Sequence, residues 1–269
     1  YSAFNETVFE VVPKEITVIV SVDDIVYCED AVVIVESEVD GQYLVEVYNQ
    51  YYAVYVVGGK GNTTIYDLFV DDDILVSVSI VDGNYSAFNT TTFDVVPKEI
   101  PVNISVGNIT YGEDAVVIVE SEVDGEYLVY VGDEQFVVTV INGAGNVSVS
   151  DLTVGSYAVN VTVIDGNYSA FNETVFDVAP KSTSVVVSVD DIVYGEDAIV
   201  LVYAEIDGEY LVEIYGQNYA VYVVDGKGNT TISDLFAGED ILVSVTIADA
   251  NYSAYNTTTF NIAPKEISV

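Results

Sequence analysis

The residues with the clearest chemical signature are asparagines that stand two positions before a serine or threonine. Asn-x-Ser/Thr is the acceptor sequence for N-linked glycosylation, which attaches a bulky sugar to a surface asparagine of a secreted protein. Thirteen of the seventeen asparagines lie in such triplets: Asn5, Asn62, Asn84, Asn89, Asn103, Asn108, Asn146, Asn160, Asn167, Asn172, Asn229, Asn251 and Asn256. This density predicts an extracellular glycoprotein. The alternative is that Asn, Ser and Thr are simply common in β-turns.

Acidic side chains form a second candidate group, because carboxylate oxygens are the ligands that calcium prefers. Asp71, Asp72 and Asp73 are consecutive, and shorter acidic pairs occur elsewhere. The chain has no twelve-residue calcium-binding loop, so solvated turn residues are the favoured interpretation. Calcium near Asp71, Asp72 and Asp73 is the alternative, and no other cofactor is expected.

The composition argues against an enzyme. The chain contains no His, which excludes Ser-His and Cys-His nucleophilic sites. Asp and Glu number 44 against 6 Lys and Arg, so carboxylate pairs at any spacing arise by accident. We predict no catalytic residue. The net charge of −38 also repels nucleic acids and anionic membranes, and neither is expected as a partner.

An internal repeat organises the chain. Tyr-Ser-Ala-Phe-Asn begins at Tyr1, Tyr85 and Tyr168, and Tyr-Ser-Ala-Tyr-Asn begins at Tyr252. Pro-Lys pairs follow the same period. Cutting after each of these prolines predicts domains at 14–97, 98–180 and 181–264, with 1–13 as the closing strand of a preceding repeat and 265–269 as the start of a following one. We therefore expect a segment of a longer array whose anchor lies elsewhere.

Each unit has the pattern of an all-β domain. In the middle unit, seven apolar runs separated by Gly, Asn and Asp turns predict seven strands: 100–106, 115–123, 127–131, 135–141, 146–152, 157–164 and 170–178. About seven short strands favour an immunoglobulin-like β-sandwich, with a transthyretin-like or fibronectin-like variant as the alternative. The chain has no Trp and one Cys, so the antibody-type core with its disulfide is not expected. Its apolar runs are far shorter than the ~20 residues of a membrane-spanning helix.

The motifs also resemble a known family. Tyr-Gly-Glu-Asp-Ala at 111–115 and 194–198, and the closing Gly-Asn-Tyr-Ser-Ala-Phe-Asn, are similar to the tandem immunoglobulin-like repeats of adhesin-like surface proteins from methanogenic archaea. The resemblance covers all three units and both partial ones. It implies a location on the cell surface and an end-to-end architecture. Cys28 departs from the pattern, because Gly112 and Gly195 stand at its position in the other units.

Several other residues have structural and functional interpretations. Cys28 is expected to be a free thiol, with a covalent link between neighbouring chains as the alternative. Lys14, Lys98 and Lys181 follow proline at unit boundaries, which disfavours the buried setting of an internal isopeptide bond. The Gly-Lys-Gly-Asn stretches at Lys60 and Lys227 read as hairpin turns rather than phosphate-binding loops.

Tyrosine is the remaining excess. Tyr51, Tyr52 and Tyr55, echoed by Tyr215, Tyr219 and Tyr222, are a hypothetical aromatic ladder on one sheet face that could stack on sugar or on a neighbouring filament. Cross-strand packing is the favoured interpretation of these tyrosines.

The spacing of the units predicts a mechanical role. Closing and opening strands are joined through proline without a flexible linker, which favours a rigid rod of ~30 Å per domain at ~3.3 Å per residue of strand. The predicted function is an extracellular, glycosylated stalk that presents or attaches at a distance from the cell. A self-assembling filament or envelope lattice is the first alternative, and a carbohydrate-binding module is the second. Expected partners are covalent N-glycans, copies of the chain, or another cell or surface polymer.

Overall fold

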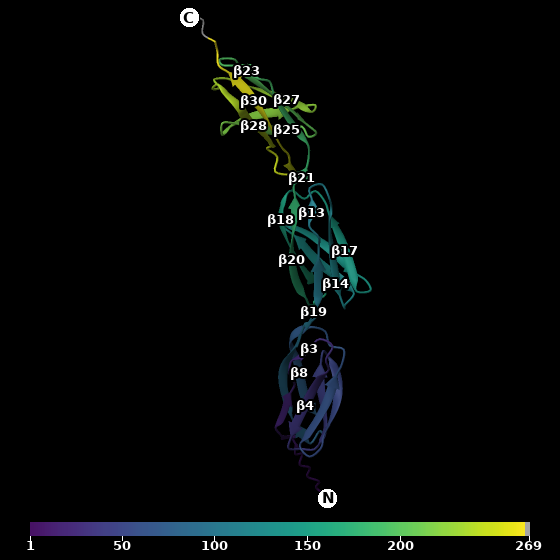
Figure 1. The fold of residues 1–269 in the computed structure, drawn as a ribbon. Helices are drawn as coiled ribbons and strands as arrows, with labels where there is room; N and C mark the ends of the chain where they lie inside the picture. Colours follow the sequence, from purple (N-terminus) through teal and green to yellow (C-terminus); the bar gives the residue numbers. More distant parts are fainter. Residues whose placement is uncertain (267–269) are drawn as a thin grey trace.

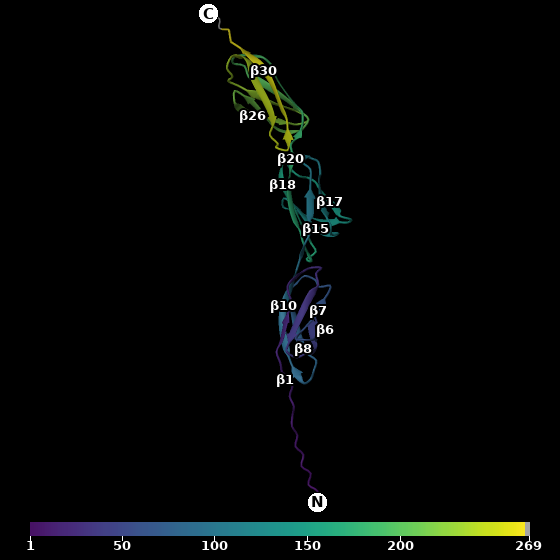
Figure 2. The same cartoon turned by 60° about the horizontal axis from the view of Figure 1, so that its bottom comes forward.

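The computed structural model describes residues 1–266, so the predicted start of a following repeat at 265–269 lies mostly outside the described residues. Figures 1 and 2 show three elongated β-units joined end to end, with the two termini at opposite ends of the molecule. Within residues 1–266, no helix is long and apolar enough to cross a membrane.

Each unit contains the same ten strands in the same order. The first has β1 (Lys14–Glu15), β2 (Val18–Ser21), β3 (Ile25–Val26), β4 (Ala31–Ser37), β5 (Gly41–Val47), β6 (Gln50–Val56), β7 (Lys60–Ile65), β8 (Asp71–Ile80), β9 (Tyr85–Ser86) and β10 (Phe88–Val96). The second has β11 (Lys98–Glu99), β12 (Val102–Ser105), β13 (Ile109–Thr110), β14 (Ala115–Ser121), β15 (Gly125–Val131), β16 (Glu134–Val140), β17 (Ala144–Val149), β18 (Gly155–Val163), β19 (Tyr168–Ser169) and β20 (Phe171–Ala179). The third has β21 (Lys181–Ser182), β22 (Val185–Val189), β23 (Ile192–Val193), β24 (Ala198–Ala204), β25 (Gly208–Ile214), β26 (Gln217–Val223), β27 (Lys227–Ile232), β28 (Gly238–Ile247), β29 (Tyr252–Ser253) and β30 (Tyr255–Ala263).

Two sheets face each other in every unit. In the first unit a three-stranded sheet has the order β2-β4-β7, and a five-stranded sheet has the order β3-β10-β8-β5-β6. The opening segment contributes to both, because β2 pairs antiparallel with β4 whereas β3 pairs parallel with β10. The other two units repeat this order strand for strand. A two-sheet sandwich with these connections is immunoglobulin-like, as predicted.

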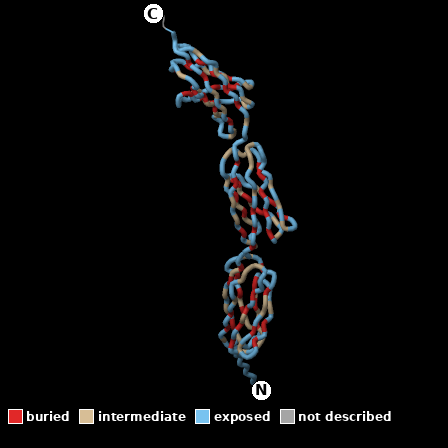
Figure 3. The backbone as a smooth tube through the Cα atoms, in the orientation of Figure 1, coloured by how far each residue is buried: buried red, intermediate tan, exposed pale blue. Residues whose placement is uncertain are grey.

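Each unit has its own hydrophobic core, formed by the inward-facing residues of both sheets (Figure 3). Strict alternation in β4 and its equivalents places every second residue in the core, as the two-residue period of a strand requires. The largest fully buried side chains are one tyrosine and one phenylalanine per unit: Tyr43, Tyr127, Tyr210, Phe93, Phe176 and Phe260. These six rings are the bulkiest side chains of cores that contain neither a Trp nor a disulfide.

The seven strands predicted for the middle unit are all found, as β12, β14, β15, β16, β17, β18 and β20. The sequence reading missed β11, β13 and β19, which have two residues each and therefore show no alternation. Residues 1–13, predicted as the closing strand of a preceding repeat, form no strand and are exposed. The equivalent residues of the first unit are held by β8 and β3, and among residues 1–266 the first thirteen have no such neighbours.

Candidate functional site

The chain passes from one unit to the next through a single unpaired residue. The last strand of the first unit, β10, ends at Val96, and β11 begins at Lys98. Only Pro97 lies between them, and Pro180 occupies the same place between β20 and β21. Because the proline ring fixes its own φ, little backbone freedom remains at either joint.

Side chains from both units meet at the first joint. The Tyr27 ring, at the end of β3, packs edge-on against the Tyr168 ring of the second unit with centroids 5.4 Å apart. Tyr27 also stacks on Phe69, from the loop before β8, with ring centroids 6.3 Å apart. The backbone N–H of Val70 in the same loop donates to Asn167 Oδ1 across the joint at 3.2 Å. Burial raises the pKa of Tyr168, and the neighbouring Cys28 adds to the shift.

The second joint repeats this geometry. Tyr111 packs edge-on against Tyr252 at 5.4 Å, and the N–H of Val154 donates to Asn251 Oδ1 at 3.0 Å. Thr153 stands where the first unit has Phe69, so the stacked ring is missing here. The contact is therefore a property of the repeat, with small differences between copies.

Asn167 is the central residue of the first joint because its backbone N–H and carbonyl and both polar atoms of its side chain make hydrogen bonds. Asp165 Oδ1 accepts from Asn167 N and Nδ2, both at 2.9 Å, which fixes the side chain. The Asn167 carbonyl accepts from Lys98 N at 3.0 Å, which ties the incoming chain to the second unit. The Asp-Gly-Asn-Tyr-Ser sequence thus makes the joint, a role that the sequence reading did not assign to it.

The Tyr-Gly-Glu-Asp-Ala motif forms the other half of the joint. Its glutamate accepts from a backbone N–H three residues earlier: Glu29 from Val26 at 3.0 Å, Glu113 from Thr110 at 2.7 Å and Glu196 from Val193 at 2.9 Å. The residue before the glutamate has positive φ: 89° at Gly112, 92° at Gly195 and 75° at Cys28. A side chain at this position is strained, and Cys28 is free and exposed.

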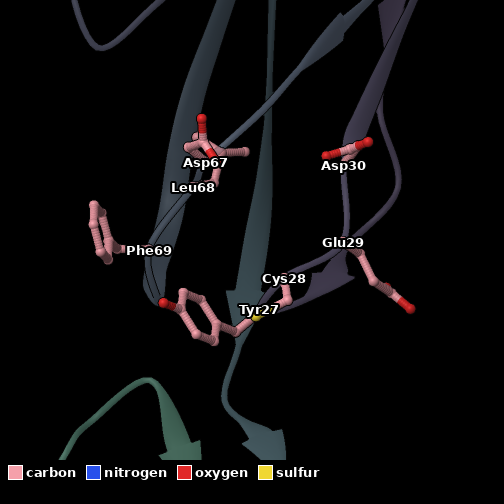
Figure 4. A pocket seen from close by; sticks show the side chains of 7 residues that line it. All are labelled: Tyr27, Cys28, Glu29, Asp30, Asp67, Leu68 and Phe69. Carbon is pink, nitrogen blue, oxygen red and sulfur yellow. The ribbon is translucent and has the colours of Figure 1, made fainter.

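A shallow hollow of about 260 Å³ lies beside the first joint, lined by Tyr27, Cys28, Glu29, Asp30, Asp67, Leu68 and Phe69. Figure 4 shows Phe69 and Glu29 on opposite sides and pointing away from each other, so the seven side chains do not converge on one point. Small-molecule sites usually enclose about 300–1,000 Å³ with convergent polar groups. The hollow is therefore part of the joint surface and not a ligand pocket.

The acidic run considered for calcium is spread along an exposed strand start. Asp71 Oδ2 accepts from the Tyr48 hydroxyl at 2.7 Å, while the Asp73 backbone N–H donates to Asp94 Oδ1 at 2.8 Å. Burial and Asp71 together raise the pKa of Tyr48 to about 12. Within the part of the chain that the structure describes, no group of three or more His, Cys, Asp or Glu is placed to hold a metal ion.

The hypothesis of a single tyrosine ladder is wrong. Tyr51 and Tyr55 are exposed on the outer face of β6, but Tyr52 packs against the core on the opposite face. Tyr219 and Tyr222 diverge in the same way in the third unit. Neighbouring residues of a strand point to opposite faces, so Tyr51 and Tyr52 cannot share one.

The lysines at the unit boundaries and in the Gly-Lys-Gly-Asn stretches are all at the surface. Lys14, Lys98 and Lys181 are exposed, so they lack the burial that an isopeptide bond needs. Lys60 begins β7 and forms an ion pair with Glu36 at 3.1 Å, and Lys227 lies 5.5 Å from the Tyr203 ring centre.

The glycosylation acceptors lie at exposed or half-buried positions throughout. Three sets recur in every unit: Asn84, Asn167 and Asn251 in the turn before β9 and its equivalents; Asn89, Asn172 and Asn256 in the closing strands; and Asn62, Asn146 and Asn229 in β7, β17 and β27. Asn5 lies in the unpaired first residues, while Asn103, Asn108 and Asn160 are acceptors of the middle unit alone.

No protein-family model matches the chain, and a search of curated proteins finds no match. Among solved structures, the chain is similar to titin I-band domains I67–I69, with 10% identity, a TM-score of 0.35, and coverage of 93% of this chain and 99% of that one. It is similar to the mouse nectin-like molecule 4 ectodomain at 10% identity and a TM-score of 0.33, covering 95% and 99%. The chain is also similar to a Salmonella alpha-2-macroglobulin, with 13% identity and a TM-score of 0.34, covering 94% of this chain and 23% of that one. TM-scores this low do not define a common fold, so the fold assignment rests on the sheet order.

Proposed function

We propose that this chain is a rigid segment of a glycosylated extracellular stalk, which presents or attaches something at a distance from the cell surface. The single observation that supports it most is the joint, where one proline separates consecutive units and the same side-chain contacts recur. A chain selected for independent domains would carry flexible linkers instead.

The interaction free energy of the joint contact is enough to bias the orientation of two linked units. A hydrogen bond contributes about 0.5–1.5 kcal/mol and an aromatic pair a similar amount. Together they favour the observed arrangement by about 1–3 kcal/mol, or roughly 5-fold to 150-fold, since each 1.4 kcal/mol is a factor of ten. The same contact would be too weak to hold separate molecules together, so covalent connection through proline is essential to the rod.

Small-angle X-ray scattering of matched variants tests the rod. Replacing Asn167 with Ala and Tyr168 with Ser removes the cross-joint bond and the ring contact, and we expect a broader distance distribution. The control replaces Asn84 with Ala and Tyr85 with Ser, the equivalent residues of the first unit, which contact no other unit within residues 1–266. Equal scattering from both variants would contradict the proposal that the joint holds the rod straight.

Imaging of native cell surfaces with a labelled antibody tests the location. A stalk predicts label standing away from the envelope on isolated fibres. A regular lattice or helical repeat would favour the assembling alternative. The net charge of −38 supports the stalk, since it opposes close lateral contact between copies at low ionic strength.

A further inference from the structure

The recurring acceptor asparagines have different structural settings, although their sequences are alike. Two sets show the contrast: the closing-strand set (Asn89, Asn172 and Asn256) and the β7 set (Asn62, Asn146 and Asn229). Each set places one asparagine in every unit. N-glycosylation uses the side-chain amide nitrogen, so the partner of that nitrogen distinguishes the two sets.

The amides of the closing-strand set hold the two sheets together. Nδ2 donates to a backbone carbonyl of the opposite sheet: Asn89 to Val18 at 2.7 Å, Asn172 to Val102 at 2.8 Å and Asn256 to Val185 at 2.8 Å. In the first two, Oδ1 also accepts from the next backbone N–H at 2.8 Å. The three side chains are half-buried. They bridge an edge where β10 and β2, and their equivalents, belong to different sheets.

The β7 set has no such role. Asn62, Asn146 and Asn229 are exposed on the outer face of the three-stranded sheet, and within residues 1–266 their side-chain amides have no hydrogen-bond partner. Each is opposite an aliphatic residue of the neighbouring strand, in the pairs Ile34–Asn62, Ile118–Asn146 and Leu201–Asn229.

Exposed aliphatic side chains lie next to these asparagines. Val32, Val116 and Ile199 are 48%, 48% and 57% exposed and pair with the Ser or Thr of the same acceptor triplets. A sugar on the neighbouring asparagine would cover this apolar surface, which a soluble protein otherwise keeps small.

We propose that Asn62, Asn146 and Asn229 carry the N-glycans, one per unit on the three-stranded sheet, and that Asn89, Asn172 and Asn256 remain unmodified because their amides are structural. This rests on the proposed glycosylated stalk. It makes the rod two-faced in the first and third units, where the outer face of the five-stranded sheet has no acceptor asparagine among the described residues. In the middle unit, Asn160 is an acceptor asparagine on the five-stranded sheet.

Glycopeptide mass spectrometry of native material tests the assignment site by site. We expect sugar on Asn62, Asn146 and Asn229 and unmodified asparagine at 89, 172 and 256. Sugar on Asn172 of the folded protein, or unmodified Asn62, Asn146 and Asn229, would overturn it.

Matched variants separate the two roles in the middle unit. Ser148→Ala removes the acceptor triplet of Asn146 and should remove one glycan mass with little change in unfolding midpoint. Thr174→Val removes the triplet of Asn172 but keeps its amide, and should change neither mass nor midpoint. Asn172→Asp removes the donor and should lower the midpoint of the second unit at unchanged glycan mass.

These glycan measurements can contradict the site assignment without contradicting the proposed stalk function. Loss of a glycan mass in Thr174→Val would overturn the division between the two sets. Absence of sugar at every site would overturn this inference and the glycoprotein part of the function. The rod shape would then still stand or fall on the scattering result.

Discussion

One buried tyrosine in each unit combines packing with a polar contact. The Tyr127 hydroxyl lies 2.7 Å from Ser121 Oγ and 2.8 Å from the Val123 carbonyl oxygen, and Tyr43 has the equivalent pair of partners. Among residues 1–266, the Tyr210 hydroxyl bonds only to the Ile206 carbonyl oxygen, at 2.9 Å, because Ala204 replaces the serine. A large ring can thus be fully buried without leaving its hydroxyl unsatisfied.

This difference between units gives a matched pair of substitutions. Tyr127→Phe should lower the free energy of unfolding of the second unit by about 1–3 kcal/mol, because two buried partners lose a hydrogen bond. Tyr210→Phe should cost the third unit less, about 0.5–1.5 kcal/mol. Hydrogen exchange during urea unfolding resolves the units. A larger loss in Tyr210→Phe would contradict this account.

A carboxylate beside a turn in the first unit, and another in the third, should make stability depend on pH. Asp40 accepts from Gly58 N and Gly59 N, both at 3.0 Å, and these N–H groups lower its pKa below the ordinary 3.8. The backbone N–H groups of Gly226 and Asp225 lower the pKa of Asp207 in the same way. Since the folded pKa lies below the unfolded one, the stabilisation is present above the unfolded pKa and is lost as pH falls through the folded pKa.

Urea unfolding of wild type and Asp40→Asn between about pH 2 and 6 checks this dependence. The first unit of the wild type should be the more stable at pH 6, and the difference should shrink as the carboxylate becomes protonated. Asp23→Asn is the control and should show no comparable trend, because among residues 1–266 the Asp23 carboxylate accepts no hydrogen bond whose loss would change stability. A difference between wild type and Asp40→Asn that is independent of pH would be inconsistent with the carboxylate bonds.

At the scale of the strand, two glycines shape the turn between β6 and β7, which belong to different sheets, and the equivalent turns of the other units. Gly59 has a φ of 87°, which favours glycine, whereas Gly61 lies against the neighbouring strand. A Cβ at Gly61 would lie 2.5 Å from the Tyr55 carbonyl oxygen and 2.8 Å from Val54 Cγ1. The repeated Gly-x-Gly-Asn sequence therefore reflects a turn followed by a close approach of strands.

Gly61→Ala should destabilise the first unit by about 1–3 kcal/mol, as overpacking of a close contact does. Gly83→Ala, where a Cβ would meet nothing within 4 Å, should change stability by less than about 0.5 kcal/mol. Thermal unfolding of the two variants provides the comparison. Equal melting temperatures would show that β7 can move away from β6 at no cost.

For the whole molecule, the dominant physical property is its charge. A net charge of −38 on an extended rod is self-repulsive, and salt screens it with a Debye length of about 30 Å at 0.01 M and about 8 Å at 0.15 M. Because each unit has its own core, the units should unfold individually, and the stability of each should depend on the salt concentration.

Melting temperatures should therefore rise as NaCl increases from about 0.01 to 0.5 M at neutral pH. The same salt series near pH 4, close to the sequence pI of about 4.1, is the internal control and should show almost no rise. An equal rise at both pH values would assign the salt effect to something other than charge repulsion.

Much of the fold could be predicted because the signals are local. Alternation in Tyr157–Val163 identified a strand of the larger sheet, and Gly-Asn and Asp-Gly pairs marked its turns. The two-residue strands β11, β13 and β19 were missed because their pairing is defined by residues about 70 positions away. The hypothesis of a tyrosine ladder was wrong because it grouped Tyr51 with Tyr52. These residues are adjacent in one strand, so their side chains point to opposite faces of the sheet.

By itself, the sequence determined the repeat, the all-β character of each unit and the excess of negative charge, because periodicity, alternation and composition are properties of the chain alone. Only the tertiary structure decided that Asn167 makes a joint, that Asn172 bridges two sheets and that Asn146 is free at the surface. All three lie in the same kind of acceptor triplet. What distinguishes them is the neighbour that each amide meets, and those neighbours come from distant strands or from another unit.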